Sequence, residues 1–157
     1  MNRSLALRNR QRRLCVDLRL LRRIVRTLLD DLLTVEQYNL GIFLAATPEM
    51  TRLNEKFLRH AGSTDVITFD YAERNDFFHG EIFVCVDEAV AQARRFRTGW
   101  QSELVRYVIH GVLHLRGFDD QRHGARLKMK REEDGLLREI GVRFALSKLA
   151  RKPRLSA

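Results

Sequence analysis

Residues 110–120, HGVLHLRGFDD, constrain the fold and the chemistry of this chain more than any other segment. Two histidines four residues apart, His110 and His114, share one face of a helix, with Cβ atoms about 5–6 Å apart. Gly117 follows, and glycine readily adopts the left-handed conformation that ends a helix. The segment therefore predicts a helix that presents two imidazoles on one face and then turns back.

The residues after this turn are suited to complete a metal site. Asp119 and Asp120 follow Gly117, where a carboxylate on the returning chain can approach a metal ion held by His110 and His114. Zinc binds imidazole nitrogen at about 2.0–2.1 Å, and three protein ligands leave the fourth position of a catalytic site open to water. The alternative is an ordinary helix with one buried and one solvated histidine, followed by a polar turn.

The overall composition is that of a globular domain. The chain has 157 residues, of which 45% are hydrophobic and 8% aromatic, which is enough for one domain with a core of its own. No apolar run approaches the length of a membrane span, and no signal peptide is visible. Two cysteines, Cys15 and Cys85, make no disulfide framework. We therefore expect a single domain over residues 1–157, located in the cytoplasm, without a membrane partner.

The net charge of +9 is unevenly distributed. Residues 1–30 carry nine Arg and two Asp, and residues 138–157 carry six Lys or Arg and one Glu. The segment between them has more acidic than basic residues. Basic ends around a nearly neutral centre favour a polyanionic partner such as a nucleic acid. The alternative is that the basic ends, including a tail at about 142–157, only improve solubility.

Hydrophobic periodicity predicts a mixture of strands and helices. Asp17 is placed to cap a first amphipathic helix, Thr47 a second and Asp87 a third. The helix with the two histidines is expected over 102–116, and Gly111 within it would let another backbone come near. A final helix is expected from about residue 122 to 141. Strands are expected over 4–10, 39–46, 64–69 and 79–86. The predicted fold class is α+β (α/β-like), a small mixed sheet of about four strands covered by about five helices, with the metal site on a central helix and the turn after it.

At this point the sequence resembles a known family, YbeY, the bacterial rRNA maturation factors and endoribonucleases. The family signature is similar to HGxLHLxGyDH, and this chain reads HGVLHLRGFDD over 110–120. Upstream, Asn54 and Phe57 before TDVITF (64–69), and GEIFV (80–84), also resemble family segments. These matches occur in order and with natural spacing over roughly 54–120.

The resemblance implies a hydrolase with one zinc ion that cleaves single-stranded RNA. It implies a role in 3′-end maturation of small-subunit rRNA and in ribosome quality control, with the ribosome or its proteins as partners. His110, His114 and Asp120 would then hold the metal, and Asp119 would orient one of these ligands. The oligomeric state is left open.

Two departures from the family pattern bear on the site. The third histidine of the family falls on Asp120 here, so the site becomes His₂Asp, which is more anionic; His123, three residues later, is the alternative third ligand. The family arginine that is thought to contact phosphate falls on Leu58, with Arg59 one residue later. Arg59 either replaces it through an adjustment of the loop or is a solvated residue at a helix end.

Two other functions are compatible with parts of the pattern. Zinc proteases share HxxxHxxG, but they carry a Glu as general base directly after the first His, where this chain has Gly111. A ribosome-assembly or RNA-binding factor with a weak or structural metal site is the second alternative, since both departures could weaken catalysis. No general base is identifiable, and His60 and His79 are expected to be structural or loop residues.

Overall fold

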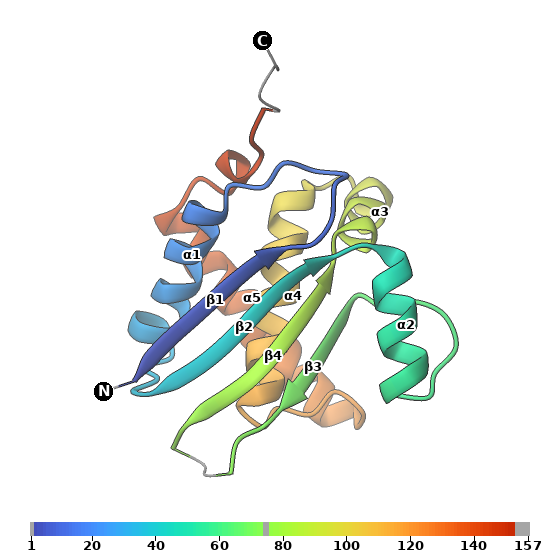
Figure 1. Cartoon of the computed structure of the whole chain (residues 1–157). Helices are drawn as coiled ribbons and strands as arrows, with labels where there is room; N and C mark the ends of the chain where they lie inside the picture. Colours follow the sequence, from blue (N-terminus) through green and yellow to red (C-terminus); the bar gives the residue numbers. More distant parts are fainter. Residues whose placement is uncertain (1, 74–75, 153–157) are drawn as a thin grey trace.

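The computed structural model describes residues 2–73 and 76–152. Four strands form one sheet in the order β1 (Arg3–Asn9), β2 (Tyr38–Ala45), β4 (Phe78–Cys85) and β3 (Val66–Asp70) (Figure 1). The first three run parallel, and β3 pairs antiparallel with β4 at the opposite edge from β1. The predicted mixed sheet of four strands is confirmed.

Five α-helices are present among the described residues. They are α1 (Leu18–Arg26), α2 (Thr47–Phe57), α3 (Val86–Phe96), α4 (Trp100–Leu115) and α5 (His123–Arg143). A π-helical segment (Thr27–Leu32) continues α1, and a 3₁₀ turn (Leu146–Leu149) follows α5. The α+β fold class is therefore confirmed. No helix in these residues is both long and apolar enough to cross a membrane.

The main hydrophobic core lies on one face of the sheet, beneath α1, α4 and α5 (Figure 1). Every second residue of a strand points to the same face, and on the central strands β2 and β4 the buried residues that point to this one are apolar. Helix α4 packs directly on the sheet, and most of its length is therefore buried. The core side chains from the central strands and from α4 include Leu40, Ile42, Leu44, Ile82, Val84, Leu104, Val108, Ile109, Val112 and Leu113.

The close approach of α4 to the sheet depends on Gly111. A Cβ atom added at this position would lie 2.6 Å from Cγ2 of Ile82 on β4. The prediction that Gly111 accommodates a neighbouring backbone is wrong in its detail, because the neighbour is a buried side chain. The glycine nevertheless brings the helix with both histidines close to the sheet.

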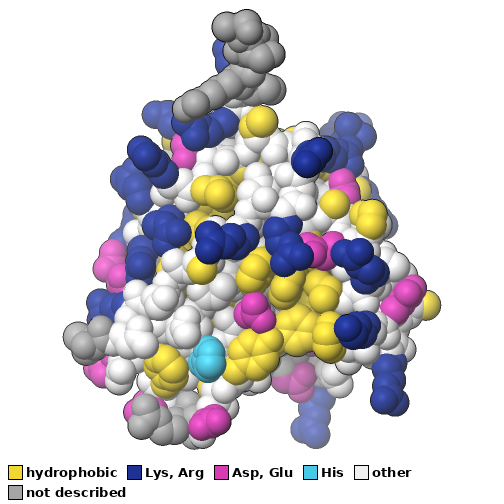
Figure 2. Space-filling model, viewed as in Figure 1, with side chains coloured by type: hydrophobic (Ala, Val, Ile, Leu, Met, Phe, Trp, Pro, Cys, Tyr) yellow, Lys and Arg dark blue, Asp and Glu magenta, His cyan; other side chains and the backbone are white. Residues whose placement is uncertain are grey.

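The opposite face of the sheet is covered only in part. A small cluster, which includes Met50, Ile67 and Phe83, packs beneath α2, the one described helix on this side (Figure 1). Much of this face remains at the surface, where hydrophobic side chains lie among arginines and lysines (Figure 2). The two faces of the sheet therefore have different environments.

Two of the three predicted helix caps are wrong. Asp17 caps α1 as expected, since its side chain accepts a hydrogen bond from the Leu20 backbone N–H at 3.0 Å. Thr47 and Asp87, however, lie inside the first turns of α2 and α3. They contact each other: the backbone N–H and the hydroxyl of Thr47 donate to Oδ2 of Asp87 at 2.8 and 2.9 Å. The backbone hydrogen bond from Thr47 lowers the pKa of Asp87 despite the opposing effect of burial. The pair thus joins two helix N-termini.

Part of the predicted basic tail is packed against the domain. Leu149 is fully buried in the main core, and its carbonyl accepts a hydrogen bond from the Asp17 backbone N–H at 2.8 Å. The Arg151 N–H donates to the carbonyl of Cys15 at 2.9 Å. Residues 149–151 therefore bind the segment that leads into α1. The rest of the predicted tail, 153–157, lies outside the described residues.

Candidate metal centre

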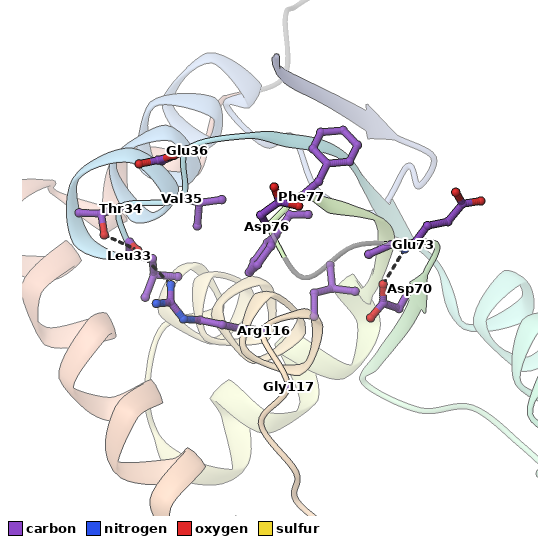
Figure 3. Close-up of a pocket in the computed structure, with 13 residues that line it drawn as sticks. Leu33, Thr34, Val35, Glu36, Asp70, Glu73, Asp76, Phe77, Arg116 and Gly117 are labelled. Carbon is purple, nitrogen blue, oxygen red and sulfur yellow. Dashed lines mark hydrogen bonds between the residues drawn. The ribbon is translucent and has the colours of Figure 1, made fainter. Parts of the chain in front are cut away.

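Two features of the structure are candidates for a functional site, a cavity and a cluster of metal-binding side chains. The cavity, about 600 Å³ in volume, lies between residues 33–36, the β3–β4 connection and the end of α4 (Figure 3). Its lining includes Glu36, Asp70 and Glu73, and the Arg116 guanidinium donates to the Leu33 carbonyl at 2.9 Å. None of the predicted site residues lines it, and its carboxylates disfavour a polyanion.

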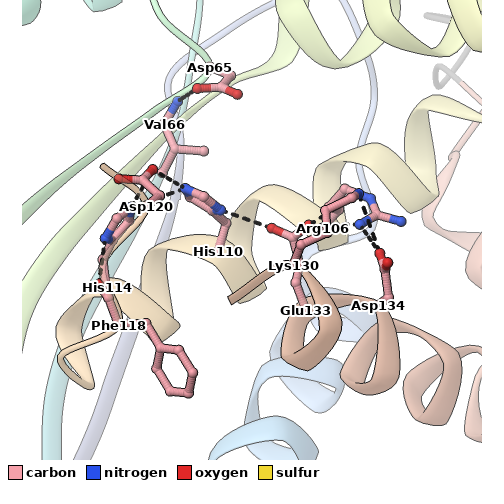
Figure 4. Close-up of polar contacts among 10 residues, drawn as sticks. All are labelled: Asp65, Val66, Arg106, His110, His114, Phe118, Asp120, Lys130, Glu133 and Asp134. Carbon is pink, nitrogen blue, oxygen red and sulfur yellow. Dashed lines mark hydrogen bonds and ion pairs between the residues drawn. The ribbon is translucent and has the colours of Figure 1, made fainter. Parts of the chain in front are cut away.

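The cluster forms where α4 ends. Gly117 has a φ of +101°, and the backbone N–H groups of Gly117 and Phe118 donate to the carbonyls of His114 and Leu113 at 3.0 Å each. This left-handed termination turns the chain back beside its own last turn. Asp120 consequently returns to the helix face that carries both histidines (Figure 4). The predicted turn is confirmed.

Three potential ligand atoms converge at this position. The two histidine Nε2 atoms, of His110 and His114, lie 3.0 Å apart. Oδ2 of Asp120 lies 3.2 Å from Nε2 of His114 and 3.4 Å from Nε2 of His110. Ligands about 2.0–2.1 Å from a zinc ion at tetrahedral corners are separated by roughly 3.3–3.4 Å. The three atoms are therefore spaced like one face of a tetrahedral site.

The hydrogen bonds behind the rings leave both Nε2 atoms free to bind a cation. Nδ1 of His110 lies 2.9 Å from Oε1 of Glu133, and Nδ1 of His114 lies 3.1 Å from the Phe118 carbonyl (Figure 4). A carboxylate and a carbonyl only accept hydrogen bonds, so Nδ1 is the donor in each ring. In a neutral imidazole the other nitrogen then carries a lone pair. Two lone pairs and a carboxylate at this spacing fit a bound metal ion.

Glu133 belongs to this site although the sequence pattern did not single it out. Its side chain is buried. The Arg106 guanidinium donates to Oε2 of Glu133 at 2.7 Å and also to Oδ1 of Asp134 at 2.6 Å. Burial raises the pKa of Glu133, but hydrogen bonds from His110 and Arg106 outweigh it, so that the pKa is lowered and the group stays ionised. A carboxylate behind a metal-binding histidine fixes the ring and raises its basicity.

The same network acts on His110. Burial lowers the pKa of His110, but the hydrogen bond and charge of Glu133, with smaller effects of Asp65 and Asp120, outweigh it and raise the pKa. These negative groups stabilise positive charge on the ring or a metal ion at its Nε2 atom. About a quarter of each histidine side chain is exposed (27% and 26%), so the site is open on one side.

The other predicted site residues do not belong to this three-residue cluster. Arg59 follows α2 with a φ of +55° and is exposed; its loop continues to Asp65, near His110 (Figure 4). The Asp119 carboxylate accepts a hydrogen bond from the Gln121 N–H at 2.9 Å, which holds the turn before α5. His123 is exposed in the first turn of α5, with Nδ1 3.3 Å from Nη2 of Arg126. Among the described residues, the cluster that could hold a metal consists of His110, His114 and Asp120.

This geometry defines a class of site: a candidate centre for a single metal ion, with three protein ligands and an open side. Comparison with known proteins identifies the family. Residues 6–141 match the model of the family described as Endoribonuclease YbeY, and the chain belongs to that family. The resemblance noted in the sequence is thereby confirmed.

Individual relatives agree with this family. Endoribonuclease YbeY of Chlorobium phaeovibrioides is 43% identical over 93 residues, which cover 59% of this chain and 62% of the relative. Endoribonuclease YbeY of Parabacteroides distasonis is 34% identical over 99 residues, which cover 63% of this chain and 69% of the relative. The solution structure of TM1509 from Thermotoga maritima has a TM-score of 0.64 and 25% identity, and covers 87% of this chain and 89% of its own. The chain thus matches about three fifths of the length of the first curated relative.

Proposed function

We propose that this protein is a metal-dependent endoribonuclease that hydrolyses single-stranded RNA, with one zinc ion held by His110, His114 and Asp120. The observation that carries the proposal is the convergence of three ligand atoms within 3.4 Å of one another on an open surface. Membership in a family described as endoribonuclease supports RNA as the substrate.

The chain's own residues have distinct roles in this mechanism. A bound zinc ion would supply a water molecule of lowered pKa and polarise a phosphoryl oxygen. Glu133 accepts the Nδ1 proton of His110 and holds that ring in place, as the Phe118 carbonyl does for His114. Asp119 stabilises the turn that carries Asp120. Arg59, in the exposed loop before Asp65, offsets negative charge that develops on the phosphate.

The biological role proposed is the one that the family implies. The protein would act in the cytoplasm on the 3′ end of small-subunit rRNA and in ribosome quality control, with the ribosome or its proteins as partners. The net charge of +9 supports a polyanionic substrate. Since the family signature has a histidine where this chain has Asp120, the ligand set carries an additional negative charge. We expect this charge to lower the Lewis acidity of the metal and to alter metal preference.

Elemental analysis of the purified protein tests the metal centre. We expect about one zinc ion per chain, lost in Asp120→Ala and retained in His123→Ala, the matched change at the alternative ligand. Absence of metal from the wild type, even after reconstitution with zinc, would refute the mechanism. Retention in Asp120→Ala with loss in His123→Ala would instead assign the third ligand to His123.

Cleavage of a single-stranded RNA tests the reaction. His114→Ala should lose cleavage while it still binds the same RNA, because the basic surfaces that hold the backbone are unchanged. If wild type and variant bind RNA equally and neither cleaves it under any metal, the protein is instead the non-catalytic RNA-binding factor considered above. The displaced arginine and Asp120 are the features that favour that alternative.

A further inference from the structure

The partly covered face of the sheet carries a connected group of aromatic rings, which we call the aromatic face. Phe43 stacks on Phe83 with ring centroids 4.6 Å apart, and Phe83 meets Phe69 edge to face at 5.8 Å. Phe69 in turn contacts Phe57 at 5.4 Å and Tyr71 at 6.5 Å. The group therefore extends from β2 through β4 to β3 and the end of α2.

The outer members of this group are more exposed than a packing role requires. Phe57 is 54% exposed and Tyr71 46%, whereas Phe83 at the centre is 7% exposed. Figure 2 shows hydrophobic side chains at the surface of this face, beside the area that α2 covers. Burying rings of this size is strongly favourable. An exposed aromatic group of this extent is typical of a surface that binds a ligand.

Positive charge accompanies the rings. Nζ of Lys56 lies 5.2 Å from the centre of the Phe57 ring, and the Arg10 guanidinium lies 5.7 Å from that of Phe43. Lysine and arginine side chains border the hydrophobic area in Figure 2. Two carboxylates on this face are engaged: Glu49 by Arg10 at 2.7 Å and Glu81 by the Tyr71 hydroxyl at 2.6 Å. The surface therefore complements a ligand that combines flat rings with negative charge.

The aromatic face is linked to the metal centre by strand β3. Val66, at the start of the strand, lies beside His110 and Asp120 (Figure 4). Phe69, three residues later, belongs to the aromatic face. Since β3 is one of the two edge strands of the sheet, an RNA strand on this face can pass around that edge to reach the metal centre.

We propose that the aromatic face holds single-stranded RNA. Bases stack on Tyr71 and Phe57, while Lys56 and Arg10 lie close enough to the rings to contact the phosphates. Aromatic platforms with basic surroundings bind single strands with little sequence preference because every base has a π face. This inference rests on the proposed function in taking RNA as the ligand. A double helix fits poorly, because its bases are already stacked on one another.

The test measures binding of a fluorescein-labelled oligouridine of about 12 nucleotides, within the range of site sizes for such surfaces. All variants carry His114→Ala, so cleavage does not interfere. Tyr71→Ala and Phe57→Ala should each bind roughly 5- to 150-fold more weakly, while Tyr71→Phe, which keeps the ring, should bind normally. Lys56→Ala should reduce the dependence of log K on log salt by about 0.7, because this variant neutralises one phosphate fewer.

Phe96→Ala is the matched control. Phe96 on α3 is 63% exposed and also has a cation beside its ring, the Arg95 guanidinium at 5.6 Å, but it lies outside the aromatic group. Its removal should leave RNA affinity unchanged. Thermal unfolding of each variant checks that the fold is intact.

Equal RNA affinity in all folded variants would overturn the proposal. A dimer detected by sedimentation and lost in Tyr71→Ala, with RNA affinity unchanged, would also overturn it and assign the face to a second copy of the chain. The two proposals can fail separately. Cleavage by the wild type with normal binding by these variants would refute only the aromatic face, and weakened binding without wild-type cleavage would refute only the hydrolase.

Discussion

At the scale of single residues, we expect Glu133 to determine how well His110 can serve as a metal ligand. Its ionised carboxylate accepts the Nδ1 proton of His110 at 2.9 Å, which makes Nε2 a better donor to a metal ion. Glu133→Gln keeps the size and an accepting oxygen but removes the charge. We expect zinc affinity to fall about 10- to 100-fold, as measured by competition with a chelating dye.

Glu132→Gln is the control for this prediction. Glu132 is the preceding residue on α5 and is exposed, so the same chemical change there should leave zinc affinity unaltered. If Glu133→Gln binds zinc as tightly as the wild type does, the carboxylate only neutralises Arg106. In that case the protein should be less stable without any change in metal binding.

The site residues that the sequence predicts lie close to their partners along the chain, whereas the one that it does not predict lies far from its partner. His110, His114 and Asp120 fall within eleven residues, so helical spacing and a glycine turn bring them together. Glu133 lies 23 residues from its partner His110 and among a run of charges. Its role depends on how α5 packs against α4, which a local pattern does not encode.

At the scale of elements, the site depends on how closely α4 packs against β4. Alanine at position 111 would suit the helix better than glycine by roughly 1 kcal/mol. The added Cβ, however, would lie 2.6 Å from Cγ2 of Ile82, which is fully buried. Overpacking of this kind costs about 1–3 kcal/mol. We therefore expect Gly111→Ala to lower the free energy of unfolding by up to about 2 kcal/mol, measured with urea.

Gly135→Ala separates helix propensity from packing. Gly135 is also in a helix interior, in α5, but a Cβ there would meet nothing within 4 Å. This variant should gain roughly 0.5–1 kcal/mol. A Gly111→Ala protein that is stabilised as much as Gly135→Ala would show that Ile82 moves aside without cost and that α4 tolerates a larger residue.

Helix starts were the least predictable feature of the elements. Thr47 and Asp87 are residue types that commonly cap helices, yet each lies one or two residues inside its helix. Their side chains bond to each other across 40 residues, and Arg13 adds an ion pair to Asp87 at 3.1 Å. Each side chain thus bonds to a residue far away in sequence and does not cap its own helix. The sequence therefore predicts that these helices exist, but it does not predict the residue at which each one begins.

At the scale of the whole molecule, the two ends of the chain stabilise each other. The segment before α1 and the turn Leu146–Leu149 are far apart in sequence, yet they share a bridge between Val16 and Ala150 and the hydrogen bond from Asp17 to Leu149. Basic residues from both ends of the sequence, Arg12, Arg151 and Lys152, therefore line one hollow of the surface. The basic residues of the C-terminal segment had suggested only a solvated tail. Their charge does not indicate that Leu149, which lies among them, is buried in the core.

Leu149 is the residue through which this end contributes to stability. Its side chain is fully buried in the main core, so Leu149→Ala removes apolar contacts and leaves a cavity. Such changes cost about 2–5 kcal/mol, and we expect a loss in this range in urea unfolding. Val142→Ala is the control: at 79% exposed, it should change stability by no more than about 0.5 kcal/mol. Equal stability of the two variants would mean that the C-terminal turn separates from the core at little cost. The expected difference would instead make residues 146–150 part of the cooperative fold that supports α4 and its candidate metal ligands.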